Sequence, residues 1–176
     1  MKNKKFFIIG AAATAVLGTL LHFVYKWSGG NTVAAVFSAV NESTFEHLKL
    51  LFWPFFISSS VGYFLFRENR RSYIFSSALA LLSGLFTIVS VFYTYTALIG
   101  RNLSFVDIVL FFVSVIVSFF LFYCFYKSGL FCGKFFDLLG ALIYIILIIL
   151  FVWFTFNPPE TPVFLDPVDK FYGIPS

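Results

Sequence analysis

The chain has 176 residues, of which 60% are hydrophobic and only 11% are charged. Its mean hydropathy of +0.95 lies far above that of soluble domains, so the composition excludes an ordinary soluble protein and indicates an integral membrane protein. The formal net charge is +4, but the basic residues form short clusters between apolar runs rather than a stripe interleaved with aromatics. Nucleic acid is therefore not an expected partner.

Five apolar segments are long enough to cross a membrane as helices. A helix rises about 1.5 Å per residue, so about 20 apolar residues span a hydrocarbon core of roughly 30 Å. We therefore expect an all-α, polytopic transmembrane bundle that forms a single domain over residues 1–156. The predicted spans are about 6–25, 48–66, 72–99, 104–126 and 135–156.

The first predicted span carries a stripe of small residues that leads to a histidine. Ala11, Ala15, Gly18 and His22 follow one another at spacings of four, three and four residues. Small residues at helical spacing allow another helix to approach closely, whether from the same chain or from a partner protein. His22 would then lie at the outer end of the span, either solvated at the level of the lipid headgroups or facing a polar pocket.

The segment "NTVAAVFSAV", residues 31–40, follows the first span and is too short to cross a membrane. Its apolar residues Val33, Val36, Phe37 and Val40 recur at helical spacing. We expect a short interfacial or re-entrant helix here.

The next segment, "NESTFEH" at residues 41–47, concentrates polar residues directly before the second span. Histidine and carboxylate side chains are ligands of divalent metal ions, and they also bind small polar molecules. The candidate ligand-binding residues are His22, Glu42, Glu46, His47 and Asp107, and the first four of these are also the candidate metal ligands. Because no HExxH-type pairing is present, a divalent metal is a possible cofactor but not one that the sequence identifies.

The same segment also matches the start of a helix. "STFE" fits a capping box, in which Ser43 is the N-cap and Glu46 bonds back to the backbone N–H of the cap. In this interpretation Glu46 is structural, and Lys49 and Trp53 anchor the helix at the membrane interface.

The third and fourth predicted spans carry polar residues for which packing is one explanation. On the third span, Ser76, Ala80, Ser83, Thr87, Ser90 and Thr94 form a stripe that suits a packing seam between helices or a path for a solute. Asp107 stands near the start of the fourth span, where the helix dipole favours a negative charge.

The C-terminal segment, residues 157–176, is proline-rich and cannot continue the fifth span. It nevertheless retains the apolar residues Phe164, Leu165, Phe171, Tyr172 and Ile174. We expect this tail to fold back over the outer mouth of the bundle as a lid.

The distribution of lysine and arginine predicts an orientation. With the N-terminus inside, eight basic residues fall on the cytoplasmic side: Lys2, Lys4, Lys5, Arg67, Arg70, Arg71, Lys127 and Lys134. Only four lie opposite, namely Lys26, Lys49, Arg101 and Lys170. This bias predicts a multi-pass protein with its N-terminus inside and its C-terminus outside.

Three stretches, "LHFVYKWSGG", "FSAVNESTFEHLKLLFWP" and "NPPETPVFLDPVDKFYGI", together resemble a family of small bacterial polytopic integral membrane proteins of unknown function. The resemblance implies a location in the bacterial cytoplasmic membrane. It implies no activity, substrate or catalytic residue.

The leading hypothesis is an outward-facing polar pocket that binds a small molecule or a lipid headgroup, as a binding or transport component. His22 and His47 would act in hydrogen bonding or proton exchange, and Glu42 would bind a cation or ammonium group. One alternative is a metal-dependent membrane hydrolase, although the sequence contains no recognised catalytic motif. Another is a subunit or assembly factor that docks a partner helix. The expected partners are thus the lipid bilayer, a small molecule or lipid, and a second copy or another membrane protein.

Overall fold

A computed structural model describes residues 2–66 and 72–175, apart from the side chains of residues 2 and 3. Within these ranges it contains six helices, and five of them are long and apolar enough to cross a membrane. The helices are α1 (Lys2–Trp27), α2 (Thr32–Phe37), α3 (Thr44–Leu65), α4 (Tyr73–Ile99), α5 (Ser104–Ser128) and α6 (Lys134–Phe156). The predicted all-α bundle with five spans and one short helix is confirmed. Arg67, Arg70 and Arg71, which contribute to the predicted orientation, lie outside the described residues.

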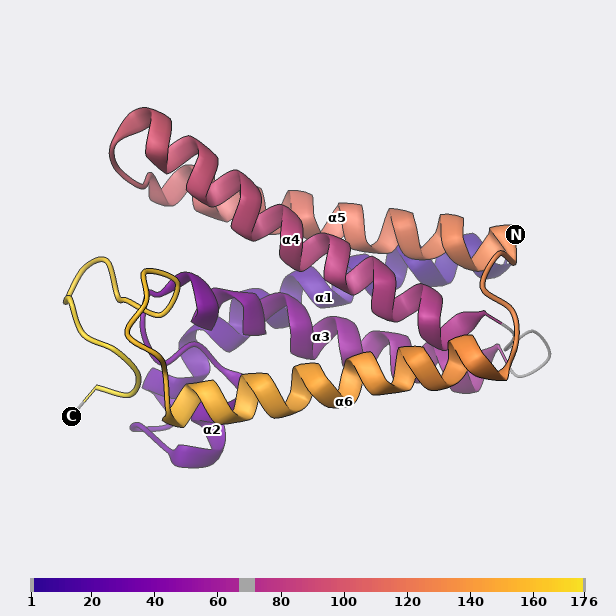
Figure 1. The fold of residues 1–176 in the computed structure, drawn as a ribbon, viewed down its shortest axis with the longest axis horizontal. Helices are drawn as coiled ribbons and strands as arrows, with labels where there is room; N and C mark the ends of the chain where they lie inside the picture. Colours follow the sequence, from indigo (N-terminus) through magenta and orange to yellow (C-terminus); the bar gives the residue numbers. More distant parts are fainter. Residues whose placement is uncertain (1, 67–71, 176) are drawn as a thin grey trace.

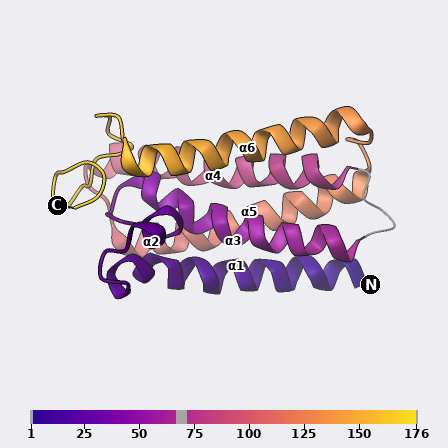
Figure 2. The ribbon, with the colours of Figure 1, turned by 90° about the horizontal axis from the view of Figure 1, so that it is seen from below.

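The five long helices run side by side along the long axis of the molecule (Figure 1). Seen from below, α1 lies along one edge and α6 along the other, with α3, α4 and α5 between them (Figure 2). The N-terminus is at one end of the bundle, and α2 and the C-terminal tail are at the opposite end (Figure 1). This second end is called the tail end below.

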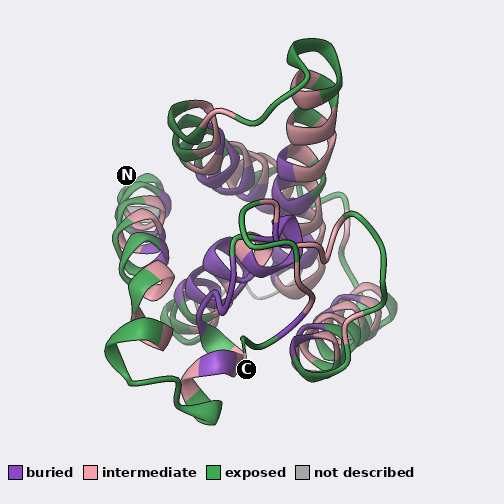
Figure 3. Cartoon of the chain, turned by 90° about the vertical axis from the view of Figure 1, so that its left-hand side faces the viewer, coloured by how far each residue is buried: buried purple, intermediate pink, exposed green. Residues whose placement is uncertain are grey.

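Helix α3 lies at the centre of the packing, because it contacts α1, α2, α4 and α5. More than half of its residues are buried, whereas only four residues of α6 are buried. Seen from the tail end, the buried residues of the molecule face the middle and the exposed ones face outward (Figure 3). The first turn of α3 therefore delivers its side chains to the interior at the tail end.

The small-residue stripe of α1 packs within the chain. A Cβ atom at Gly18 would meet the backbone oxygen of Leu50 in α3 and the ring of Phe111 in α5. In a regular helix the carbonyl of Leu50 would accept the N–H of the residue four positions later, but that residue is Pro54, which has no N–H. The backbone of Gly18 therefore faces a carbonyl that the proline leaves free. One turn further along the bundle, the hydroxyls of Thr14 and Ser58 lie 3.2 Å apart and link the same two helices.

The stripe of serine, threonine and alanine on α4 is buried in its first part and is half-buried or exposed from Ser83 onward. Ser76 and Ala80 are fully buried. The hydroxyls of Ser83, Thr87 and Thr94 each donate to the carbonyl four residues earlier in α4. These hydroxyls are thus satisfied by their own helix, as is usual for such residues in apolar surroundings.

Candidate functional site

A cavity of about 530 Å³ lies at the tail end, between α1, α3, α4 and α5. Its polar lining consists of Thr19, His22, Glu42, Thr44, His47, Asn102, Ser104 and Asp107. Its apolar lining includes Leu50, Ile88, Phe92, Ile108, Phe111 and Phe112, together with Pro167 and Val168 from the tail. Four of the five predicted site residues line the cavity, namely His22, Glu42, His47 and Asp107, and Glu46 does not.

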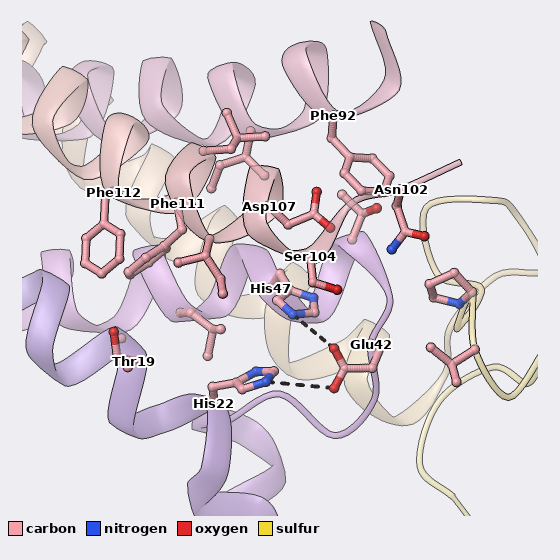
Figure 4. A pocket seen from close by; sticks show the side chains of 18 of the residues that line it. Thr19, His22, Glu42, His47, Phe92, Asn102, Ser104, Asp107, Phe111 and Phe112 are labelled. Carbon is pink, nitrogen blue, oxygen red and sulfur yellow. Dashed lines mark ion pairs between the residues drawn. The ribbon is translucent and has the colours of Figure 1, made fainter. Parts of the chain in front are cut away.

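Two histidines converge on one glutamate at the polar end of the cavity (Figure 4). His22 comes from α1, His47 from α3, and Glu42 from the loop that precedes α3. Nε2 of His47 lies 3.4 Å from one oxygen of Glu42, and Nε2 of His22 lies 3.8 Å from the other. The two imidazole rings are 5.3 Å apart between centroids. We call His22, Glu42 and His47 the His–Glu–His cluster.

The backbone around Glu42 is held by buried neighbours, while its side chain is half exposed. The backbone N–H of Glu42 donates to Oδ2 of Asp166 in the tail at 2.9 Å. The side chain of Asn41 accepts the N–H of Ser43 and donates to the carbonyl of Gly173, at 2.9 and 2.8 Å. The carboxylate of Glu42 is thereby presented to the cavity from a fixed loop.

Ser38 connects this loop to the end of α1. Its hydroxyl accepts the N–H of Tyr25 at 2.8 Å and donates to the carbonyl of Leu21. In an uninterrupted helix the N–H of Tyr25 would donate directly to the carbonyl of Leu21, four residues earlier. The hydroxyl of Ser38 is therefore inserted between two groups of α1 that would otherwise bond to each other. His22 lies within the same turn, and the insertion brings it to the loop that carries Glu42.

His47 is oriented by a backbone carbonyl. Its Nδ1 lies 2.9 Å from the oxygen of Ser43. Because a carbonyl oxygen only accepts, Nδ1 must carry a proton and donate it to Ser43. In the neutral ring, Nε2 then presents a lone pair toward Glu42.

Glu46, predicted as a ligand, is instead part of a buried ion pair. One carboxylate oxygen of Glu46 lies 2.5 Å from Nζ of Lys49 and also accepts the N–H of Val40 at 2.9 Å. Ser43 is the N-cap of α3, as predicted, and accepts the N–H of Glu46. The other predicted bond of the capping box, from the N–H of Ser43 to the side chain of Glu46, is wrong. That N–H donates to the side chain of Asn41, and the carboxylate of Glu46 pairs with Lys49.

The prediction that Lys49 and Trp53 anchor α3 at the membrane interface is also wrong. Lys49 is fully buried, and its ammonium donates to the carbonyl of Ala35 and the hydroxyl of Thr155 as well as to Glu46. The indole N–H of Trp53 donates to the carbonyl of Val36 at 2.9 Å. Helix α2 covers both side chains, so they join α2 and α6 to α3.

Asp107 lines the cavity from α5 but stands apart from the His–Glu–His cluster. Its carboxylate accepts a short hydrogen bond from the hydroxyl of Tyr95 in α4. The same hydroxyl accepts the N–H of Leu103 at 3.2 Å. Asp107 therefore also ties the α4–α5 connection together.

The tail packs over the loop that carries Glu42. Asp166 is buried, and its second oxygen accepts the N–H groups of Val168 and Asp169. The N–H of Phe45 donates to the carbonyl of Val163, and the rings of Phe45 and Phe164 lie 4.5 Å apart. The tail thus contributes both to the support of Glu42 and, through Pro167 and Val168, to the wall of the cavity.

Sequence reasoning missed the neutral polar residues of the lining, which are Thr19, Thr44, Asn102 and Ser104. It also missed Asp166, which supports the cluster without joining it. The only local signal for Asp166 is "LDPVD", in which an aspartate before proline is typical of a turn. Nothing local could indicate that this turn reaches the backbone of Glu42.

Comparisons with known proteins identify one family. The model of a family of unknown function (DUF6512) matches residues 1–174. No curated protein and no solved structure matches the chain.

Proposed function

The chain belongs to a family of unknown function, DUF6512, so we propose its function from the cavity itself: it binds an amphipathic small molecule or a lipid at the tail end of the bundle. The headgroup would lie at the polar lining, and the apolar part between α1 and α5. Transport of the bound molecule is one use of such a site. The observation that carries the proposal is a cavity of about 530 Å³ with a polar wall and an apolar wall, within the size range of small-molecule pockets.

The position of the apolar lining supports an amphipathic ligand. Phe23 of α1 and Ile108 and Phe112 of α5 line the cavity, yet each is more than 40% exposed. In a chain with five candidate spans, such side chains at the edge of a bundle face lipid. A molecule with a hydrocarbon part could therefore reach the cavity between α1 and α5 without leaving the membrane.

The charges of the lining favour a cationic or metal-bound headgroup. Glu42 and Asp107 carry negative charge, and the lining residues identified in the described ranges include no lysine or arginine. An anionic group entering alone would meet two carboxylates and gain no ion pair.

The proposal includes the predicted location and orientation. We assign the protein to the bacterial cytoplasmic membrane, as the family resemblance implies, and we place its N-terminus inside on the bias of basic residues. The cavity and the N-terminus are at opposite ends of the bundle (Figure 1), so the cavity would open at the outer face.

A blocking substitution tests the proposal. Thr19 lines the cavity from the exposed side of α1, and its only described side-chain bond is to the carbonyl of Ala15 in its own helix. Thr19→Trp would fill the space between α1 and α5 without entering the packed core. We expect the wild-type protein, purified in mild detergent and incubated with a polar lipid extract of the expression host, to retain a specific amphiphile in native mass spectrometry. The variant should retain at least tenfold less.

The matched control is Leu20→Trp, at the next position of α1, which is exposed and does not line the cavity. It should retain the amphiphile as the wild type does. Equal retention by the wild type and both variants would reject the cavity as the binding site.

A further inference from the structure

We infer that the His–Glu–His cluster is a binding site for a divalent transition-metal ion, with zinc as the ion that its donor atoms suit best. One ligand atom from each of His22, Glu42 and His47 lies within 4.8 Å of the others. Two imidazoles and one carboxylate form a zinc ligand set that leaves a coordination position open. This inference rests on the three side chains and not on the organic ligand proposed above.

The first argument is the absence of a hydrogen-bond donor where one is needed. His47 uses its Nδ1 proton on Ser43, so Nε2 of the neutral ring directs a lone pair at a carboxylate that also only accepts. Within the described residues, Nδ1 of His22 is buried without a hydrogen-bond partner. Nε2 of the neutral His47 ring and the carboxylate of Glu42 are therefore two acceptors that face each other, and a cation between them would turn this repulsion into bonding.

The distances favour a metal ion over a shared proton. A charge-assisted N–H···O bond brings nitrogen and oxygen to about 2.7–2.9 Å. The separations from Glu42 are 3.4 Å to His47 and 3.8 Å to His22, which are too long for that. Ligands on a tetrahedral zinc with bonds of about 2.0–2.1 Å stand about 3.4 Å apart. With one ligand atom from each residue, the cluster spans at most 4.8 Å, so its side chains would move together by up to about 1.4 Å on a bound zinc ion.

The surroundings have the features of a supported metal site. The carbonyl of Ser43 fixes the ring of His47 through its second nitrogen, which is the usual arrangement for a histidine that binds metal. Asp166 holds the backbone of Glu42, and Ser38 holds the turn that contains His22. The ring of His47, the backbone of Glu42 and the helical turn of His22 are therefore each held by a hydrogen bond from outside the cluster.

The open coordination position would face the cavity, because all three ligands are part of its lining. Without the metal, the two carboxylates of the cavity disfavour an anionic group. With a divalent ion at the cluster, an oxygen of a phosphate or carboxylate headgroup could complete the coordination.

Zinc binding to the purified full-length protein tests the inference. After removal of metal with a chelator, we expect the wild type to take up one equivalent of zinc by elemental analysis. Cobalt, added in place of zinc, should give the absorption bands of a low-coordinate site with nitrogen and oxygen ligands. His22→Ala, Glu42→Gln and His47→Ala should each weaken zinc affinity more than tenfold in competition with a chromogenic chelator.

Asp107→Asn is the matched control, since it removes a carboxylate of the same cavity that is bonded to Tyr95 and lies outside the cluster. It should bind zinc as the wild type does. If a ligand variant lacks the wild-type helical content by circular dichroism, His22→Gln and His47→Gln replace it, since glutamine keeps the size of the side chain. Zinc uptake equal in the wild type and in folded ligand variants would overturn the inference, and so would equal loss in Asp107→Asn.

The lipid experiment separates this inference from the proposed function. Thr19→Trp should lose the amphiphile and keep its zinc, because Thr19 supplies no ligand to the cluster. A wild-type protein that retains the amphiphile, loses it on Thr19→Trp and never binds zinc would overturn the metal site and leave the cavity proposal standing.

Discussion

At the scale of single residues, Lys49 determines how the tail end is held together. Its buried ammonium uses its donors on Glu46, Ala35 and Thr155, which belong to α3, α2 and α6. A buried cation is tolerated only when it is paired and hydrogen-bonded, and here both conditions are met. Glu46 therefore belongs to the structure of the molecule, whereas Glu42, four residues earlier, is free to bind.

We predict that Glu46→Gln strongly destabilises the protein. The substitution leaves the ammonium of Lys49 buried with neutral partners only, and breaking a buried pair in this way costs about 3–5 kcal/mol. Glu46→Gln with Lys49→Met removes the unpaired charge and should recover most of the loss. Thermal unfolding in detergent, followed by circular dichroism, measures both effects.

The control for this prediction is Glu42→Gln, whose side chain is half exposed and should tolerate the change with little effect on unfolding. If Glu46→Gln unfolds at the same temperature as Glu42→Gln, the ion pair contributes nothing to stability.

At the scale of elements, the contact of α1 with α3 sets the position of His22. The stripe of small residues could be predicted from spacing alone, because helical periodicity is a local property of the sequence. The surface that the stripe contacts could not be predicted in this way. It depends on a backbone carbonyl of another helix, α3, which Pro54 leaves without its usual hydrogen-bond donor. Gly18 is one turn from His22, so the closeness of the two helices here brings the histidine to Glu42.

We predict that Gly18→Ala destabilises the bundle and weakens zinc binding. The added methyl group would meet the backbone oxygen of Leu50, which cannot turn away, and the ring of Phe111. Such overpacking costs about 1–3 kcal/mol, against a gain in helix propensity of at most about 1 kcal/mol. Thermal unfolding and zinc competition on the same sample measure the two effects.

Gly10→Ala is the control within the same helix, because the nearest atoms to its methyl group would all belong to the ring of Phe119, a side chain that can shift more easily than a backbone oxygen. It should be nearly neutral and leave zinc affinity unchanged. A larger loss of stability in Gly10→Ala than in Gly18→Ala would contradict this account of the α1–α3 contact.

At the scale of the whole molecule, length and hydropathy were sufficient to predict the five spans and the short helix between the first two. The spacing of polar residues also selected His22, Glu42 and His47, but it could not separate them from Glu46. That distinction depends on α2, which covers Lys49 and draws Glu46 inward, and on the tail, whose Asp166 holds Glu42 from far along the chain. Both are tertiary contacts between distant segments, and no local pattern contains them.

The arrangement of the whole molecule also leads to a prediction about its orientation. Cys132 is exposed in the connection between α5 and α6, at the same end of the bundle as the N-terminus (Figure 1). Asn102 is exposed at the opposite end, in the lining of the cavity. With the N-terminus inside, Cys132 faces the cytoplasm and Asn102 faces the exterior.

Labelling of intact cells with a membrane-impermeant maleimide distinguishes the two ends. In a Cys124→Ser protein, which keeps Cys132 as its single cysteine, we expect labelling only after the membrane is permeabilised. In a protein with Cys124→Ser, Cys132→Ser and Asn102→Cys, we expect labelling before permeabilisation. The reverse pattern would place the cavity at the cytoplasmic face, and any metal or amphiphile would then have to reach the site from inside the cell.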